Sequence, residues 1–127
     1  MCLHAIRDTY VEPRAYYGIG YKVMLRCLGS YLFLHQGRGD EVLSGQWIHE
    51  HDHRYGSWEF IDSLSSYYPT GFHIYDRYED AAKAAELFGP HRPPVLLVNY
   101  TGVVAEGSEY DAKVIVAKDM KILAELE

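Results

Sequence analysis

The feature that most limits the fold of this chain is that it carries one complete helix signal. Asp76 with Glu79 forms a capping-box pattern before an alanine-rich segment, and Gly89-Pro90 stops that segment after Phe88. The pattern predicts one main helix over residues 76–88. Because the other apolar segments are short and bounded by glycine, proline or polar residues, most of the remaining core has to come from β-strands.

Apolar segments with the bounds of β-strands recur along the chain. Residues 31–35 and 95–100 are apolar on both faces, which is typical of inner strands covered on both sides. Near the C-terminus we expect one or two more strands, with a turn close to Lys118-Asp119. The expected strands are residues 21–28, 31–35, 71–75, 95–100, 111–117 and 120–124.

A second, weaker helical pattern covers residues 57–66, where apolar side chains are spaced three and four apart before Tyr67-Tyr68-Pro69. Strands still outnumber helices. The sequence therefore predicts an α+β fold, with a curved mixed or antiparallel sheet packed against the main helix and this possible second one. At 127 residues, the chain fits one domain over residues 1–127.

Charge and hydropathy exclude several function classes. The formal net charge of −6 lacks the cationic field that binds long nucleic acid, so we expect no duplex nucleic-acid partner. No apolar run approaches the length of a membrane span, and Arg7 and Asp8 interrupt any signal-peptide core. Cys2 and Cys27 form no CxxC pair, and we expect both to be reduced thiols. These features predict a cytoplasmic protein.

The densest polar motif alternates three histidines with acidic residues. In an extended segment His49, His51 and His53 point to the same side, and three imidazoles can hold a zinc ion. The other interpretation is a hydrated loop in which each histidine pairs with a neighbouring acid. The spacing fits both, and no cofactor is otherwise indicated.

Tyrosine outnumbers phenylalanine 12 to 4, and arginines are interleaved with the aromatic side chains. Aromatic rings stack on planar ligands, and guanidinium groups bind phosphate, so this mixture predicts a pocket for a small anionic ligand such as a nucleotide. Each ring has the alternative role of covering the core. The candidate ligand-binding residues are Tyr21, Arg38, Trp47, His73, Tyr75 and Arg77. Gly18-Ile19-Gly20 lacks the spacing of a phosphate-binding loop and is expected to form a turn.

Several short motifs together resemble small accessory proteins of bacteriophages and prophages. They are the N-terminal Met1-Cys2-Leu3, the strand Tyr21-Lys22-Val23-Met24, and Gly71-Phe72-His73-Ile74-Tyr75 leading into Glu79-Asp80-Ala81. The resemblance implies a non-enzymatic protein in the host cytoplasm that inhibits immunity. Its partner would be a host defence component, either a nucleotide messenger or a protein. Exposed aromatic residues and strand edges also make a homo-oligomer plausible.

An enzymatic alternative comes from a second similarity. The strand 71–75 followed by a helix is similar to the strand-and-helix step of ADP-ribosyltransferases. That similarity implies that Leu34-His35-Gln36-Gly37 stands near the first histidine or arginine motif of that family, and that Glu109 stands near its catalytic glutamate. We therefore expect a binding protein first and an NAD-using enzyme second.

Overall fold

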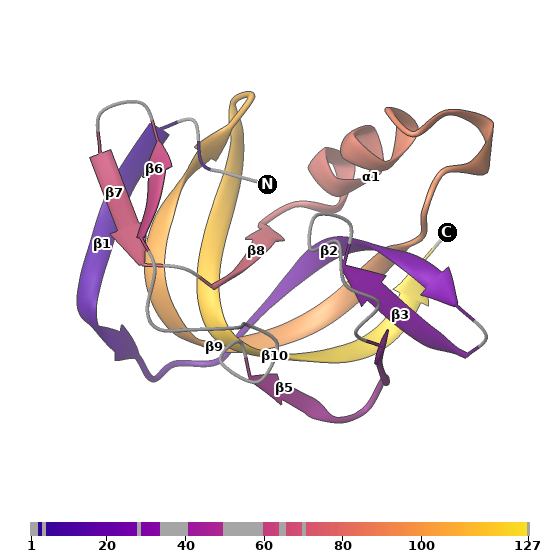
Figure 1. Ribbon diagram of the computed structural model, residues 1–127, viewed down its shortest axis with the longest axis horizontal. Helices are drawn as coiled ribbons and strands as arrows, with labels where there is room; N and C mark the ends of the chain where they lie inside the picture. The colour runs from indigo at the N-terminus through magenta and orange to yellow at the C-terminus, as the bar shows by residue number, and fades with distance from the viewer. Residues whose placement is uncertain are drawn as a thin grey trace.

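A long, bent hairpin organises the molecule. In the computed structural model, which describes residues 3, 5–27, 29–33, 41–49, 60–63, 66–69 and 71–126, strands β9 (Val95–Glu109) and β10 (Ala112–Leu126) pair along almost their whole length. They are joined at Tyr110 and Asp111, whose φ angles of 48° and 66° suit a tight hairpin turn. Figure 1 shows both strands curving around the centre of the molecule.

The remaining strands add to the two edges of this hairpin. Along β9, the first half pairs with β2 (Gly18–Cys27) and the second half with β1 (Ala5–Arg14). Along β10, the first half pairs with β8 (Phe72–Tyr75) and the second half with β5 (Trp47–His49). Because β8 also pairs with β2 through Tyr75 and Tyr21, strands β2, β9, β10 and β8 form a closed ring.

Short strands extend the structure outside this ring. Strands β3 (Ser30–Phe33) and β4 (Glu41–Val42) continue the sheet from β2, and β6 (Phe60–Ser63) pairs with β7 (Ser66–Pro69) in a separate hairpin. Every pairing among the described strands is antiparallel. Of the two kinds of sheet that the sequence allows, mixed or antiparallel, the structure has the antiparallel one. The predicted helix over 57–66 is wrong, because its described residues belong to β6 and to the start of β7.

The main helix, α1 (Tyr78–Glu86), lies where the sequence predicts it but is shorter than residues 76–88. Its N-cap is Arg77, and no side chain caps the helix. The Asp76 amide donates a hydrogen bond to the Lys113 carbonyl at 3.1 Å. Asp76 therefore still continues the pairing of β8 with β10, which excludes the expected capping box. The short 3₁₀ helix η2 (Gly89–His91) follows α1.

The path of the chain near the C-terminus also differs from the prediction. The turn expected near Lys118-Asp119 is absent, because β10 runs through these residues as one strand. The chain bends there instead: Gly102 of β9 has a φ of 72° and lies against Lys118. Strand β1 carries no comparable apolar run and was not expected.

Two apolar cores stabilise this arrangement. The larger one is formed by side chains of β2, β4, β5, β8, β9 and β10 and includes Met24, Ile74, Leu96, Val98 and Met120, all completely buried. The second one packs α1 against β2, β8 and β9 through small residues, Ala81 and Ala85. Among the described residues, no helix is long and apolar enough to cross a membrane.

Candidate functional site

An enclosed polar cluster lies between β2, β8 and the end of β9. It consists of Lys22, His73, Tyr75 and Glu109. The Lys22 Nζ donates a hydrogen bond to the His73 carbonyl at 2.9 Å, and the Tyr75 hydroxyl donates to Glu109 Oε1 at 3.5 Å. His73 and Tyr75 are buried, and the Glu109 Oε2 atom is shielded from solvent. The cluster thus gathers a cation, a carboxylate and a phenol inside the fold.

Close packing of β2 against β8 encloses this cluster. A Cβ atom on Gly20 would overlap the side chain of Ile74 and lie 2.9 Å from the Tyr75 carbonyl oxygen. Gly18 in the same strand lies against the ring of Tyr100, which a Cβ atom at this position would overlap. The expectation that Gly18-Ile19-Gly20 forms a turn is therefore wrong. These glycines are strand residues that leave room for neighbouring side chains and backbone.

Enclosure changes the acid–base properties of the cluster. Burial lowers the pKa of Lys22 from 10.5 to about 8, and the Glu109 carboxylate partly opposes this effect. Burial also raises the pKa of Tyr75, and the nearby Glu109 raises it further. Lys22 consequently loses its proton in mildly alkaline solution, whereas Tyr75 stays neutral.

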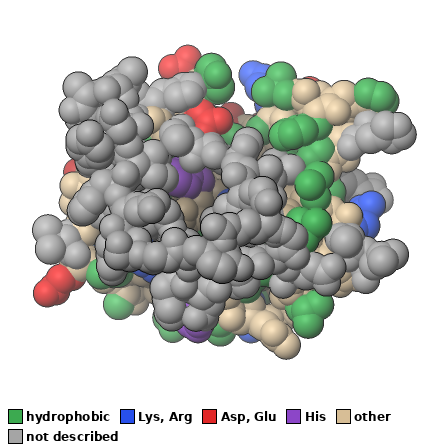
Figure 2. Space-filling view, viewed as in Figure 1, with side chains coloured by type: hydrophobic (Ala, Val, Ile, Leu, Met, Phe, Trp, Pro, Cys, Tyr) green, Lys and Arg blue, Asp and Glu red, His purple; other side chains and the backbone are tan. Residues whose placement is uncertain are grey.

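An open groove, which we call the α1 groove, lies beside this cluster and has a volume of about 340 Å³. Its walls come from α1, the segment before β9 and the ends of β2 and β10. The lining residues are Arg26, Tyr78, Ala82, Ala85, Arg92, Pro93, Pro94, Val95, Glu125 and Leu126. In Figure 2 apolar side chains gather over the region of α1 and β2. The volume falls within the range of small-molecule pockets.

Two arginines supply positive charge to the α1 groove. Arg26 contacts Glu125 Oε1 through Nη2 at 2.7 Å and through Nε at 2.8 Å. Arg92 contacts Glu86 at 3.6 Å. Tyr78 joins the groove to the enclosed cluster, because its ring contacts the ring of Tyr21 edge-on with centroids 5.9 Å apart. The groove therefore combines guanidinium groups, an aromatic ring and apolar walls.

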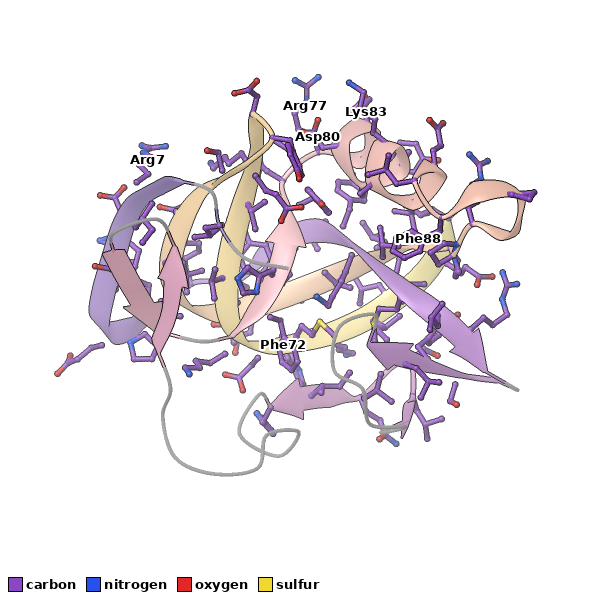
Figure 3. The ribbon with its side chains drawn as sticks, turned by 45° about the horizontal axis from the view of Figure 1, so that its top comes forward. Arg7, Phe72, Arg77, Asp80, Lys83 and Phe88 are labelled. Carbon is purple, nitrogen blue, oxygen red and sulfur yellow. The ribbon has the colours of Figure 1, made fainter. Side chains whose placement is uncertain are left out.

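The structure brings together only some of the predicted ligand-binding residues. Tyr21, His73 and Tyr75 meet around the enclosed cluster, since Tyr21 pairs directly with Tyr75. Trp47 lies on β5 and packs against Tyr17, with ring centroids 5.7 Å apart. Arg77 points away from the sheet in Figure 3 and lies 3.7 Å from Glu79. Arg38 is outside the described residues.

Only one of the three histidines of the expected metal site lies among the described residues. His49 pairs through Nδ1 with the Asp119 carboxylate, and His51 and His53 lie outside the described residues. Within the described ranges, no three histidine, cysteine or acidic side chains are arranged to hold a metal ion. The contact with Asp119 agrees with the interpretation of a histidine paired with an acid, although this acid comes from β10 rather than from the same loop.

Sequence reasoning missed the residues of the α1 groove and the role of Lys22. Lys22 has a visible signal, because it stands alone between apolar residues in the strand Tyr21-Lys22-Val23-Met24. A single lysine in such a strand indicates a buried or paired amine. Arg26, Arg92 and Glu125 carry no local signal, since they meet only when the ends of β2 and β10 lie beside the segment before β9.

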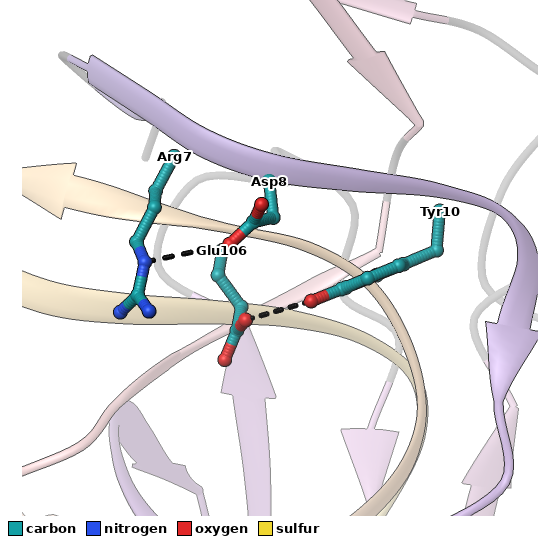
Figure 4. Close-up of polar contacts among 4 residues, drawn as sticks. All are labelled: Arg7, Asp8, Tyr10 and Glu106. Atoms are coloured by element: carbon teal, nitrogen blue, oxygen red, sulfur yellow. Dashed lines mark hydrogen bonds and ion pairs between the residues drawn. The ribbon is translucent and has the colours of Figure 1, made fainter.

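A further polar contact joins β1 to β9. The Tyr10 hydroxyl donates to Glu106 Oε2 at 2.9 Å (Figure 4), and the Arg14 guanidinium lies 4.7 Å from the centre of the Tyr10 ring. This hydrogen bond raises the pKa of Tyr10, and burial contributes less. The contact ties β1 to β9, and we assign it a structural role.

Comparison with known proteins gives no match: no family model, curated protein or solved structure is similar to this chain.

Proposed function

We propose that this protein is a non-catalytic binding protein whose α1 groove holds a small anionic ligand with a planar ring, such as a nucleotide. The observation that carries the proposal is the placement of Arg26 and Arg92 in one groove with the ring of Tyr78. Arginine matches phosphate oxygens with a fork of N–H donors, and a tyrosine ring gives a face for stacking. The net charge of −6 does not oppose this, because binding depends on local guanidinium groups.

Calorimetry with a panel of nucleotides tests the proposal. The panel contains cyclic mononucleotides, cyclic dinucleotides, ADP and ADP-ribose. We expect at least one to bind, and Arg26→Gln or Arg92→Gln to weaken that binding about tenfold or more, as expected for a charge-assisted contact. Arg7→Gln is the matched control, because Arg7 also lies near a single carboxylate, at 3.4 Å, and projects from β1 away from α1 (Figure 3).

Two results would contradict the proposal. One is the absence of heat for every member of the panel. The other is a bound nucleotide whose affinity falls as much in Arg7→Gln as in Arg26→Gln, since this would place the ligand elsewhere or show only a general charge effect.

The resemblance to phage accessory proteins puts the nucleotide messengers of host defence first among the ligands to be tested. Sequestering such a messenger would inhibit immunity without any chemical step. The related proposal is that the partner is a host defence protein. This second proposal would be favoured if no nucleotide of the panel binds and if the wild type, but not Tyr78→Ala, captures a host defence protein from host lysate.

The second candidate is an NAD-using ADP-ribosyltransferase, and the contact between Tyr75 and Glu109 favours it. The Tyr75 hydroxyl lies 3.5 Å from Glu109 Oε1, so Glu109 lies beside the strand on which the similarity to that family rests. Incubation with labelled NAD and lysate tests it: label transfer or NAD cleavage that is lost in folded Glu109→Gln would replace the binding proposal. Intact NAD and unlabelled protein would exclude the enzyme.

A further inference from the structure

Both arginines of the α1 groove are held by carboxylates of the same chain. Arg26 is paired with Glu125 at the end of β10, and Arg92 is paired with Glu86 at the end of α1. The side chains of Arg26 and Arg92 are 61% and 56% exposed, so both pairs are open to solvent. Exposed pairs of this kind contribute about 0.2–1 kcal/mol, which a phosphate group can replace.

The two pairs differ in strength. Two nitrogens of Arg26 contact one oxygen of Glu125, at 2.7 and 2.8 Å, whereas one nitrogen of Arg92 lies 3.6 Å from Glu86. A ligand therefore meets a weakly held guanidinium on the helix side of the groove and a firmly held one on the sheet side. Together the four groups have no net charge, which gives a single negative charge little advantage in the groove.

We propose that Glu86 and Glu125 are built-in competitors that restrict the α1 groove to ligands with two phosphate groups, one for each arginine. The inference rests on the proposed function. A ligand with one phosphate displaces the weak pair at Arg92 and leaves the Arg26 pair intact. A ligand with two phosphates replaces both carboxylates and keeps its ring on Tyr78.

Calorimetry with two adenine nucleotides tests the competitors. Cyclic AMP carries one phosphate and ADP carries two, and we expect the wild type to bind ADP more tightly. Glu86→Gln and Glu125→Gln each remove one competing charge and should tighten nucleotide binding about two- to fivefold, which corresponds to the strength of an exposed ion pair. In the double variant both nucleotides should bind more tightly, and ADP should gain more than cyclic AMP, because only ADP has to displace both carboxylates.

Glu79→Gln is the matched control, because Glu79 also lies on α1 and pairs with an arginine, Arg77, at 3.7 Å, outside the groove. It should leave both affinities unchanged. If the wild type binds ADP through Arg26 but Glu125→Gln and Glu86→Gln behave like Glu79→Gln, the competitor inference is wrong and the proposed function stands. If no variant binds either nucleotide, and the wider panel also gives no heat, both proposals are wrong.

Discussion

The enclosed polar cluster and the α1 groove each place a cation near a carboxylate, but in opposite surroundings. In the cluster, Lys22 and Glu109 are shielded by β2 and β8, and burial lowers the pKa of Lys22 to about 8. In the groove, Arg26 and Glu125 touch directly, yet their side chains are 61% and 33% exposed. The difference teaches that exposure to solvent decides which charged groups hold the fold together and which are available to a ligand.

The largest expected difference in the free energy of unfolding comes from replacing a glutamate by glutamine in each of the two regions. Glu109→Gln removes the carboxylate that opposes the desolvation of Lys22 inside the protein and should lower the free energy of unfolding by about 3 kcal/mol at neutral pH. Glu125→Gln removes an exposed partner and should cost less than about 1 kcal/mol. Urea denaturation measures both values. Equal costs would show that the two regions do not differ in solvation.

A smaller effect tests whether enclosure is the cause. Gly20→Ala pushes β2 away from β8 and should cost about 1–3 kcal/mol, as overpacking does. Because water then reaches the cluster, the pKa of Lys22 should rise from about 8 towards 10.5. Carbon NMR of the lysine Cε atoms follows this titration.

Gly18→Ala is the control for this experiment. Its new Cβ atom meets the ring of Tyr100 rather than Tyr75. It should cost a similar amount of stability and leave the pKa of Lys22 unchanged. If the pKa of Lys22 rises equally in Gly18→Ala and Gly20→Ala, the packing of the strands at Gly20 does not control solvent access to Lys22.

The smallest effect is a pH dependence. The folded protein holds Lys22 at a pKa of about 8, whereas the unfolded chain returns it to 10.5, so between these values the unfolded state binds more protons. The contribution of Lys22 to stability therefore rises with pH in this window. From pH 7.5 to 9.5, the free energy of unfolding of the wild type should rise by about 1–2 kcal/mol relative to Lys22→Met. If the difference between the wild type and Lys22→Met does not change with pH, Lys22 behaves as an exposed lysine with an ordinary pKa.

Much of the fold follows from local sequence patterns. The alanine-rich segment with its Gly89-Pro90 stop identifies α1, and the apolar runs around Val23, Ile74 and Val98 lie in β2, β8 and β9. The helix predicted over 57–66 fails because spacing alone does not separate a short helix from a strand. The turn predicted at Lys118-Asp119 fails because polar residues also occur within long strands that bend.

The candidate site is less predictable because its residues come from distant segments. Tyr21 and Tyr75 are 54 positions apart and meet through strand pairing. Arg26 and Glu125 are 99 positions apart and meet at the ends of β2 and β10. Composition indicates that the chain has arginine and tyrosine residues for a pocket. Which of them line one groove depends on the folded structure, which brings together Arg26, Arg92 and Tyr78 rather than Arg77 and Trp47.

The most direct test of the central claim is an NMR titration of the labelled protein with ADP, which reports each contact by position. We predict that the Nε–H signals of Arg26 and Arg92 and the amide of Tyr78 shift together and saturate, while the signals of Arg7 and Arg77 stay in place. Shifts confined to Arg77 or Trp47, or no shift at Arg26 and Arg92 at millimolar ADP, would contradict a phosphate site in the α1 groove.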